Sequence, residues 1–405
     1  MIEDNKIVFV AHSGKQLDCN PFAIFESLLH SQIGKSLKFV CLVKSELLER
    51  CRTLYADKTN VRFVDYDTHQ AQEEVKTCSV FINNQLMIKY YNEGVRKQAG
   101  QLFINTWHGS FGLKKIPVRD SLDVVHKSCF EFDYFLANSE FESKVYKESF
   151  GKAVVPILTG HPRNDILFSK DGISDIKSSL KIDSDEKIVL WMPSARDAFD
   201  ASTFSVNEEE ILANLSKKFS GKWKLLYRFH RNNIEDYNVC NFKNAIDVSK
   251  YPSLNDLLRS ADVLITDYSS VICDFILMGK PAFIYAPDYE QFVRFNPLYW
   301  DLEELPFGCA KDMSSLCYNI HKFDESVYCK GVQKWLDKVG CIEDGKATQR
   351  ITQIILDFLN KRPSSLLNYT KIISPTIAAQ LGYKKIFLTF RNIGCLLYTS
   401  DAADD

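Results

Sequence analysis

The sequence predicts an α/β protein with two doubly wound domains that face a central cleft. Short apolar runs alternate with segments of helical periodicity, which is typical of βαβ units and a parallel sheet. The alternation occurs in two series, and the polar stretch 169–187 separates them. The chain has 405 residues, which is long enough for two domains with separate cores.

The first series predicts a domain over residues 1–168. Its expected strands are Ile7–Val10, Phe39–Val43, Val61–Val64, Val80–Ile82, Leu102–Asn105, Phe132–Ala137 and Val154–Leu158. Its expected helices are Pro21–Leu29, Asn92–Gln98 and Ser139–Phe150, the last with Asn138 or Ser139 as its cap.

The second series predicts a domain over residues 185–330. Its expected strands are Ile188–Met192, Lys224–Phe229, Ala245–Asp247, Val263–Ile265 and Ala282–Tyr285. Its expected helices are Glu208–Phe219, Ser253–Ser260 and Val271–Met278, and Gly279 and Pro281 suit the end of the last one.

The C-terminal part divides into three segments. Residues 331–361 are expected to be helices that pack back across the domains, because 347–360 has helical periodicity. Residues 362–395 are weakly patterned, with basic residues among apolar ones, and suit either an interfacial segment or a basic-faced surface helix. Residues 396–405 fit nothing upstream and are interpreted as a sequencing or cloning scar, so the sequence leaves open whether the natural chain extends past about residue 395.

The composition argues against several classes of protein. The formal net charge of −2 gives no general electrostatic case for binding nucleic acid. The 12 cysteines form no C-x-x-C pair, so neither a zinc site nor a thioredoxin-like centre is expected. The chain shows no secretory signal and no apolar run long enough to span a bilayer.

The segment Thr266-Asp267-Tyr268-Ser269-Ser270 connects an expected strand to an expected helix. A helix start carries unpaired backbone N–H groups and partial positive charge, so it suits a phosphate, and hydroxyl groups can donate further bonds. The alternative is an ordinary helix cap made by Ser269 or Asp267.

A second candidate site is Asn105–Ser110, which follows the apolar run 102–104. A histidine at a strand end, here His108, can reach a cleft and remove a proton from a substrate hydroxyl. Gly109 would allow a close approach of backbone to a ligand, and Lys114 could neutralise an acidic substrate. The alternative is a buried histidine bonded to backbone.

Three further segments also follow expected strands, where ligands bind in such sheets. In Thr159–Asp165, Arg163 suits either a two-bond contact with phosphate or a structural salt bridge, while His161 is expected to be structural. Arg196 lies in a small-residue turn after 188–192. His230, flanked by arginines, is either a surface residue or a donor to a diphosphate bridge that stabilises the leaving group.

Several of these motifs occur together in one order. They are Trp107-His108-Gly109, Gly160–Asp165, Met192–Asp197, Tyr251-Pro252, Asp256–Leu258, Asp262–Val271 and Asp274-Phe275. In this order the chain resembles the CDP-glycerol glycerophosphotransferase family, the teichoic acid primases and polymerases. The resemblance covers roughly residues 80–300.

The resemblance implies a GT-B fold and transfer of glycerol phosphate or ribitol phosphate from CDP-glycerol or CDP-ribitol to a hydroxyl, with release of CMP. It implies His108 as general base and His230 as a second essential histidine at the donor phosphates. It implies Thr266, Ser269, Ser270 and Arg163 as donor phosphate-binding residues. We add Gly109, Lys114, Arg196 and Asp267 as supporting residues, and the resemblance implies neither a metal nor a cofactor.

Two departures from the family pattern bear on the substrate. Arg231 stands where the family usually has proline, and Ser110-Phe111-Gly112 stand where it often has threonine and proline. The acceptor is expected to be a lipid-linked or surface-polysaccharide precursor in teichoic acid or capsule synthesis. The enzyme is expected at the cytoplasmic face of a bacterial-type cell membrane, as a peripheral protein.

Two other functions stay open at this point. One is a GT-B nucleotide-sugar glycosyltransferase or epimerase, and the other is an inactive member that docks in a wall-assembly complex. The sequence does not distinguish glycerol from ribitol, one transfer from polymerisation, or one oligomeric state from another.

Overall fold

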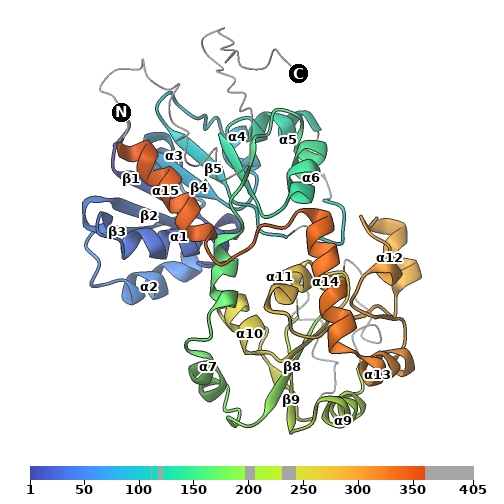
Figure 1. Cartoon of the computed structure of the whole chain (residues 1–405). Coiled ribbons are helices and arrows are strands. Elements are labelled where there is room, and N and C mark those ends of the chain that lie inside the picture. The colour runs from blue at the N-terminus through green and yellow to red at the C-terminus, as the bar shows by residue number, and fades with distance from the viewer. Residues whose placement is uncertain (111, 117–121, 197–205, 230–242, 361–405) are drawn as a thin grey trace, which may run out of the picture.

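The computed structural model describes residues 1–110, 112–116, 122–196, 206–229 and 243–360. It consists of two lobes, each built on a parallel sheet (Figure 1). The seven-stranded sheet of the first lobe has the order β3 (Val61–Asp65), β2 (Lys38–Val43), β1 (Lys6–Val10), β4 (Val80–Asn83), β5 (Leu102–Asn105), β6 (Tyr134–Ala137) and β7 (Pro156–Leu158).

The six-stranded sheet of the second lobe has the same winding. Its order is β10 (Ile246–Asp247), β9 (Trp223–Tyr227), β8 (Lys187–Met192), β11 (Val263–Thr266), β12 (Ala282–Tyr285) and β13 (Cys309–Ala310). In both sheets the strand order reverses beside the first strand, at the β1–β4 pair and at the β8–β11 pair. Ligands of doubly wound sheets bind outside the carboxyl ends of the strands at such a point. The two-sheet α/β fold class expected from the sequence is confirmed.

Helices cover both faces of each sheet, which explains why the strands are near-continuous apolar runs. In the first lobe they are α1 (Cys19–Leu29), α2 (Ser45–Leu54), α3 (His69–Thr77), α4 (Ile88–Asn92), α5 (Leu122–Cys129) and α6 (Glu140–Phe150). In the second they are α7 (Ile173–Ser179), α9 (Glu208–Phe219), α10 (Leu254–Ser260), α11 (Val271–Phe275), α12 (Tyr289–Phe295), α13 (Met313–Lys322) and α14 (Glu325–Val339). Successive residues of β1 enter opposite cores, since Val8 packs in one cluster and Ile7 and Phe9 in the other.

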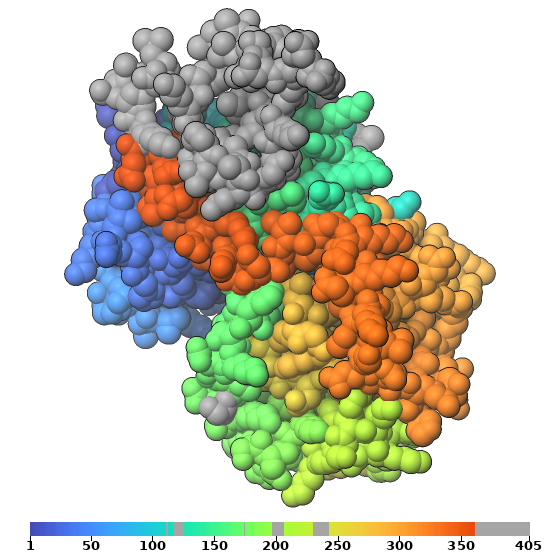
Figure 2. All heavy atoms as spheres, in the orientation of Figure 1, coloured from blue at the N-terminus to red at the C-terminus, as the bar shows by residue number. Residues whose placement is uncertain are grey.

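The chain passes between the lobes at two places within the described residues. The 3₁₀ segment η3 (Pro162–Phe168) leads from the first lobe to the second. After α14, residues 340–346 return to the first lobe, where α15 (Ala347–Asn360) packs against α1. Figure 2 shows this orange C-terminal part lying across the junction of the lobes. The two sheets lie within residues 6–158 and 187–310. We propose lobe boundaries at 1–168 and 185–330, with the returning helices within 331–361.

One sequence expectation was wrong in this part of the chain. The helix expected at Asn92–Gln98 does not form, because α4 ends at Asn92 and Gly94 has the left-handed φ of 83° that ends helices. The polar stretch 169–187 lies between the two sheets and contains α7, which buries Ile176 in the second lobe. The tail segments 362–395 and 396–405 lie outside the described residues.

Candidate functional site at the facing strand ends

His108 follows β5 and lies one strand away from the reversal point of the first sheet. Its Nδ1 is 2.8 Å from the backbone carbonyl oxygen of Asn84, the residue after β4. A carbonyl only accepts, so Nδ1 carries the hydrogen and Nε2 keeps its lone pair. The ring centroid lies 4.5 Å from that of Trp107, with the two planes tilted by 35°, and the Trp107 backbone has a left-handed φ of 50°. This tautomer leaves Nε2 able to accept a proton.

The surroundings of His108 keep it neutral. Burial, together with the charges of His12 and Arg163, lowers its pKa to about 4, although the hydrogen bond to Asn84 acts in the opposite direction. An anion bound beside the ring would raise this pKa, because an opposite charge favours the protonated form. The imidazole is therefore a free base before a substrate binds and becomes a stronger one beside a bound diphosphate.

The loop after His108 faces the start of α11 in the other lobe. A Cβ atom built on Gly109 would lie 3.9 Å from Ser270 Oγ, and one built on Gly112 would lie 3.6 Å from Ser270 Cβ. Ser269 and Ser270 are partly exposed. Ser269 Oγ accepts from the N–H of Val271 at 3.4 Å. The N-cap of α11 is Ser270, whose side chain makes no capping hydrogen bond, so neither Ser269 nor Asp267, the two caps expected from the sequence, caps this helix. The two lobes thus place hydroxyl groups opposite the histidine loop.

Thr266 and Asp267 hold the turns rather than pointing to a ligand. The buried Thr266 hydroxyl donates to the carbonyl of Met192 at 2.6 Å. The Asp267 carboxylate accepts from the N–H of Ser194 at 2.8 Å and from Arg196 Nη2 at 2.8 Å. Arg196 also donates to Asp288, through Nε at 2.7 Å. These contacts join the loops after β8 and β11, so they support the serine segment, and a phosphate contact by Thr266 stays a prediction.

Arg163 is buried at the junction of the lobes. Its Nη2 lies 3.1 Å from Oδ2 of Asp274, a residue of α11, and the two side chains are 7% and 6% exposed. Asp274 also accepts from the Ser110 hydroxyl and from Asn164 Nδ2. The sequence offered two alternatives for Arg163, and these contacts correspond to the structural salt bridge. A contact between Arg163 and phosphate stays a prediction.

A buried acid–base group lies beside that ion pair. His161 Nε2 is 3.0 Å from Glu142 Oε2, both side chains being buried, which agrees with the structural role expected for His161. The Glu142 carboxylate raises the pKa of His161 against the effect of burial. Glu343, from the returning segment, accepts from the His161 N–H and from Asn164, and burial raises its pKa to about 7.

Lys114 lies in a segment that pairs the lobes. It forms an antiparallel bridge with Leu298, and its Nζ is 5.8 Å from the ring centroid of Phe292. The N–H of Lys115 donates to the Pro297 carbonyl at 2.9 Å. The backbone here therefore joins the lobes, and neutralisation of an acidic substrate by Lys114 stays a prediction.

His230 lies outside the described residues, as do Arg231 and Phe111. Its role at the donor phosphates stays a prediction. The neighbouring Arg228 donates to the carbonyls of Val248 and Tyr251 at 2.9 and 2.8 Å, so it fixes the loops after β9 and β10.

Sequence reasoning missed Asn84 and His12 as site residues. Asn84 follows β4, and His12 follows β1, so both stand at the reversal point of the first sheet. The rule that located His108, a polar residue just after a buried strand, could have found both.

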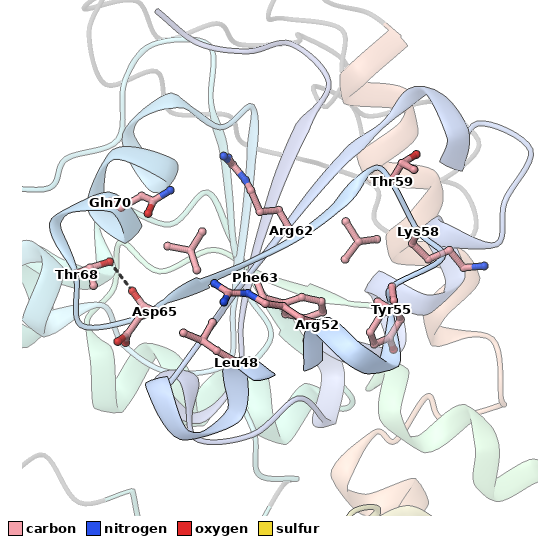
Figure 3. Close-up of a pocket in the computed structure, with 13 residues that line it drawn as sticks. Leu48, Arg52, Tyr55, Lys58, Thr59, Arg62, Phe63, Asp65, Thr68 and Gln70 are labelled. Atoms are coloured by element: carbon pink, nitrogen blue, oxygen red, sulfur yellow. Dashed lines mark hydrogen bonds between the residues drawn. The ribbon is translucent and has the colours of Figure 1, made fainter. Parts of the chain in front are cut away.

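A surface hollow of about 490 Å³ lies elsewhere, between α2 and β3 (Figure 3). Arg52 and Arg62 line it, and Arg62 pairs with Glu74 at 2.6 Å. The hollow follows an edge strand, where charged side chains protect against pairing with other chains. It is therefore explained without a ligand.

The comparisons with known proteins identify the family. The family described as CDP-glycerol:poly(glycerophosphate) glycerophosphotransferase matches residues 1–357. The chain belongs to this family. It is therefore an enzyme of the glycerophosphotransferase class, as the sequence motifs predicted.

Relatives of this glycerophosphotransferase differ in length. It is 26% identical to a teichoic acid poly(glycerol phosphate) polymerase of Bacillus spizizenii over 86% of this chain and 91% of that protein. It is 26% identical to a teichoic acid glycerol-phosphate transferase of Staphylococcus aureus over 87% of this chain and 92% of that one. A teichoic acid poly(ribitol-phosphate) polymerase of B. spizizenii is 26% identical, and the match spans 88% of this chain but 56% of that protein.

Solved structures show the same fold. The wall teichoic acid polymerase TagF aligns with a TM-score of 0.73 at 22% identity, over 89% of this chain and 90% of that one. A TagF variant solved with CDPG aligns with a TM-score of 0.71 over the same shares. The GT-B architecture expected from the sequence is confirmed by this likeness.

Proposed function

We propose that the protein transfers glycerol phosphate or ribitol phosphate from the corresponding CDP-alditol to an acceptor hydroxyl and releases CMP. Family membership gives the class of reaction, and the relatives are named for both glycerol and ribitol polymers. The observation that carries the mechanism is the neutral imidazole of His108, with Nδ1 held by the Asn84 carbonyl and Nε2 able to accept a proton.

In the proposed step, His108 Nε2 takes the proton of the acceptor hydroxyl while that oxygen attacks the β-phosphorus of the donor. The new P–O bond forms as the bond to the α-phosphate oxygen breaks, and CMP leaves with the electron pair. Ser269 and Ser270, with the N–H groups at the start of α11, would hold the diphosphate opposite the base. Because α11 has only five residues, its dipole is small, so the hydroxyl groups are expected to matter more.

We propose a lipid-linked or surface-polysaccharide acceptor and peripheral attachment at the cytoplasmic face of the membrane. Among the residues that the structure describes, no helix has the length and apolar character needed to cross a bilayer. The names of the relatives support an acceptor in teichoic acid synthesis, and a role in capsule synthesis belongs to the same proposal.

The proposal is tested by incubating the protein with CDP-glycerol, CDP-ribitol or UDP-sugars and measuring release of CMP or UDP. The expected result is CMP release that falls at least about 100-fold in His108→Ala, the usual scale for loss of a general base. His30→Ala, at an exposed histidine of the same lobe, is the matched control. Release of UDP would indicate a sugar transferase or epimerase, and release of neither nucleotide would indicate an inactive docking protein.

A further inference from the structure

Left-handed backbone is concentrated around His108. The described residues include six non-glycine positions with positive φ, and four of them are His12 (49°), Ser13 (54°), Cys19 (64°) and Trp107 (50°). Asn20 joins these segments, since its Nδ2 donates to the carbonyls of Thr106 and Trp107 at 2.9 and 3.1 Å. Such conformations persist where the surrounding structure enforces them, and they cluster at functional sites.

Asn84 holds His12 beside His108. The His12 N–H donates to Asn84 Oδ1 at 2.8 Å, and Asn84 Nδ2 lies 3.3 Å from His12 Nε2. The backbone carbonyl of the same asparagine accepts from His108. The two imidazole rings meet edge to face with centroids 5.6 Å apart. One residue therefore sets the positions of both rings.

Asp18 presents its carboxylate to the same point. Its Oδ1 lies 3.5 Å from His12 Nε2, and the side chains of His12 and Asp18 are 24% and 21% exposed. Asp18 is the N-cap residue of α1, yet its side chain makes no capping hydrogen bond. Aspartate is a preferred cap, but here the carboxylate lies beside His12 and does not bond to the start of α1.

We propose that His12 and Asp18 bind a second hydroxyl of the acceptor, adjacent to the attacking one, and so select acceptors that end in a vicinal diol. This inference rests on the proposed function and deepens it. A carboxylate accepts from an O–H group, and the His12 ring, held by Asn84 with its Nε2 3.5 Å from Asp18 Oδ1, forms the wall beside that hydroxyl. The negative charge of Asp18 would repel the donor diphosphate, so the occupant is the uncharged polyol end of the acceptor.

The test compares two acceptors of equal charge with CDP-glycerol as donor. One is an alkyl ester of glycerol 1-phosphate, whose free end is a vicinal diol, and the other is the matching ester of 1,3-propanediol phosphate, which lacks the second hydroxyl. The variants are Asp18→Asn, which keeps the shape, and His12→Asn, because asparagine tolerates the left-handed backbone. Asp175→Asn and His69→Asn, at exposed positions, are the matched controls.

The wild type and both controls are expected to prefer the diol. In Asp18→Asn and His12→Asn the ratio of the two kcat/KM values should fall at least about tenfold, as when a bond to a charged group is lost. A thermal unfolding midpoint like that of the wild type shows that the variants are folded. If the wild type releases CMP but uses the two acceptors equally, or uses neither, this inference fails while the proposed function stands. An unchanged ratio of the two kcat/KM values in both variants would have the same consequence. A wild type that releases no CMP from either CDP-alditol would overturn the proposed function and this inference with it.

Discussion

The buried pair of Arg163 and Asp274 allows a test that separates a structural role of Arg163 from contact with the donor. Arg163→Met removes the guanidinium and keeps much of the apolar volume. Asp274 would then retain the Ser110 hydroxyl and Asn164 but lose its only described cation within 4 Å. The two side chains are less than a tenth exposed. Breaking a pair this buried is expected to cost about 3–5 kcal/mol, because the remaining charge stays out of water.

The double variant Arg163→Met/Asp274→Leu provides the matched comparison. Since both charges are then absent, we expect it to lose clearly less stability than the sum of the single variants, by about 1–3 kcal/mol. Urea unfolding followed by fluorescence and circular dichroism measures this coupling, and agreement of the two signals checks that the transition is cooperative. The same proteins are assayed for the KM of CDP-glycerol.

One result would refute the structural assignment. If Arg163→Met unfolds at the same urea concentration as the wild type and raises the KM of CDP-glycerol, the guanidinium contacts the donor phosphates and the ion pair is incidental. A large loss of stability with a strong coupling to Asp274 would instead support a tie between the lobes.

Three further predictions concern the site. Ser270→Ala should lower kcat/KM for the CDP-alditol about tenfold and leave the thermal unfolding midpoint unchanged. Thr266→Val should lower the midpoint, because the Thr266 hydroxyl donates to the Met192 carbonyl. Steady-state kinetics measure kcat/KM, and thermal melts measure the midpoint. The pKa of His108 without substrate is about 4, so kcat/KM should stay constant from pH 8 to 6 and fall only as the pH approaches 4. A fall in kcat/KM centred near pH 6.5 would contradict the argument from burial. Burial raises the pKa of Glu343 to about 7, above that of an unfolded glutamate. The stability that the protonated carboxyl contributes is therefore lost as the pH rises from 4.5 through 7. In urea titrations, the free energy of unfolding of Glu343→Gln should exceed that of the wild type by about 2 kcal/mol at pH 8 and by little at pH 4.5.

All of the described strands except the two-residue β13 could be predicted to within about two residues, because both faces of each sheet are covered. Ile188–Met192, for example, is apolar throughout, and β8 is Lys187–Met192. Helices with a narrow apolar face gave a weaker signal. In α2 only Cys51 is buried, so this helix was not predicted. The helix expected at Asn92–Gln98 failed because a glycine ended it after its first residue.

The site was only partly predictable, for a different reason. His108 has a local signal, a histidine between a buried strand and a glycine. Asn84 orients it through a backbone carbonyl, a group that every residue has, so no side-chain pattern shows that role. The partner of Arg163 is 111 residues away in the chain, and only the folded structure brings them together.

The position of α15 has a consequence for how the protein is made. Its Ile351, Ile355 and Phe358 complete an apolar cluster with Ile24, Phe25 and Leu28 of α1. When the nascent chain has emerged from the ribosome only as far as the second sheet, the side of α1 that packs against α15 is therefore still exposed to solvent. Co-translational folding usually completes the N-terminal part first, but here the apolar face of α1 stays exposed until α15, the last described helix, has been synthesised. Exposed apolar surface of this kind is prone to aggregation during that interval.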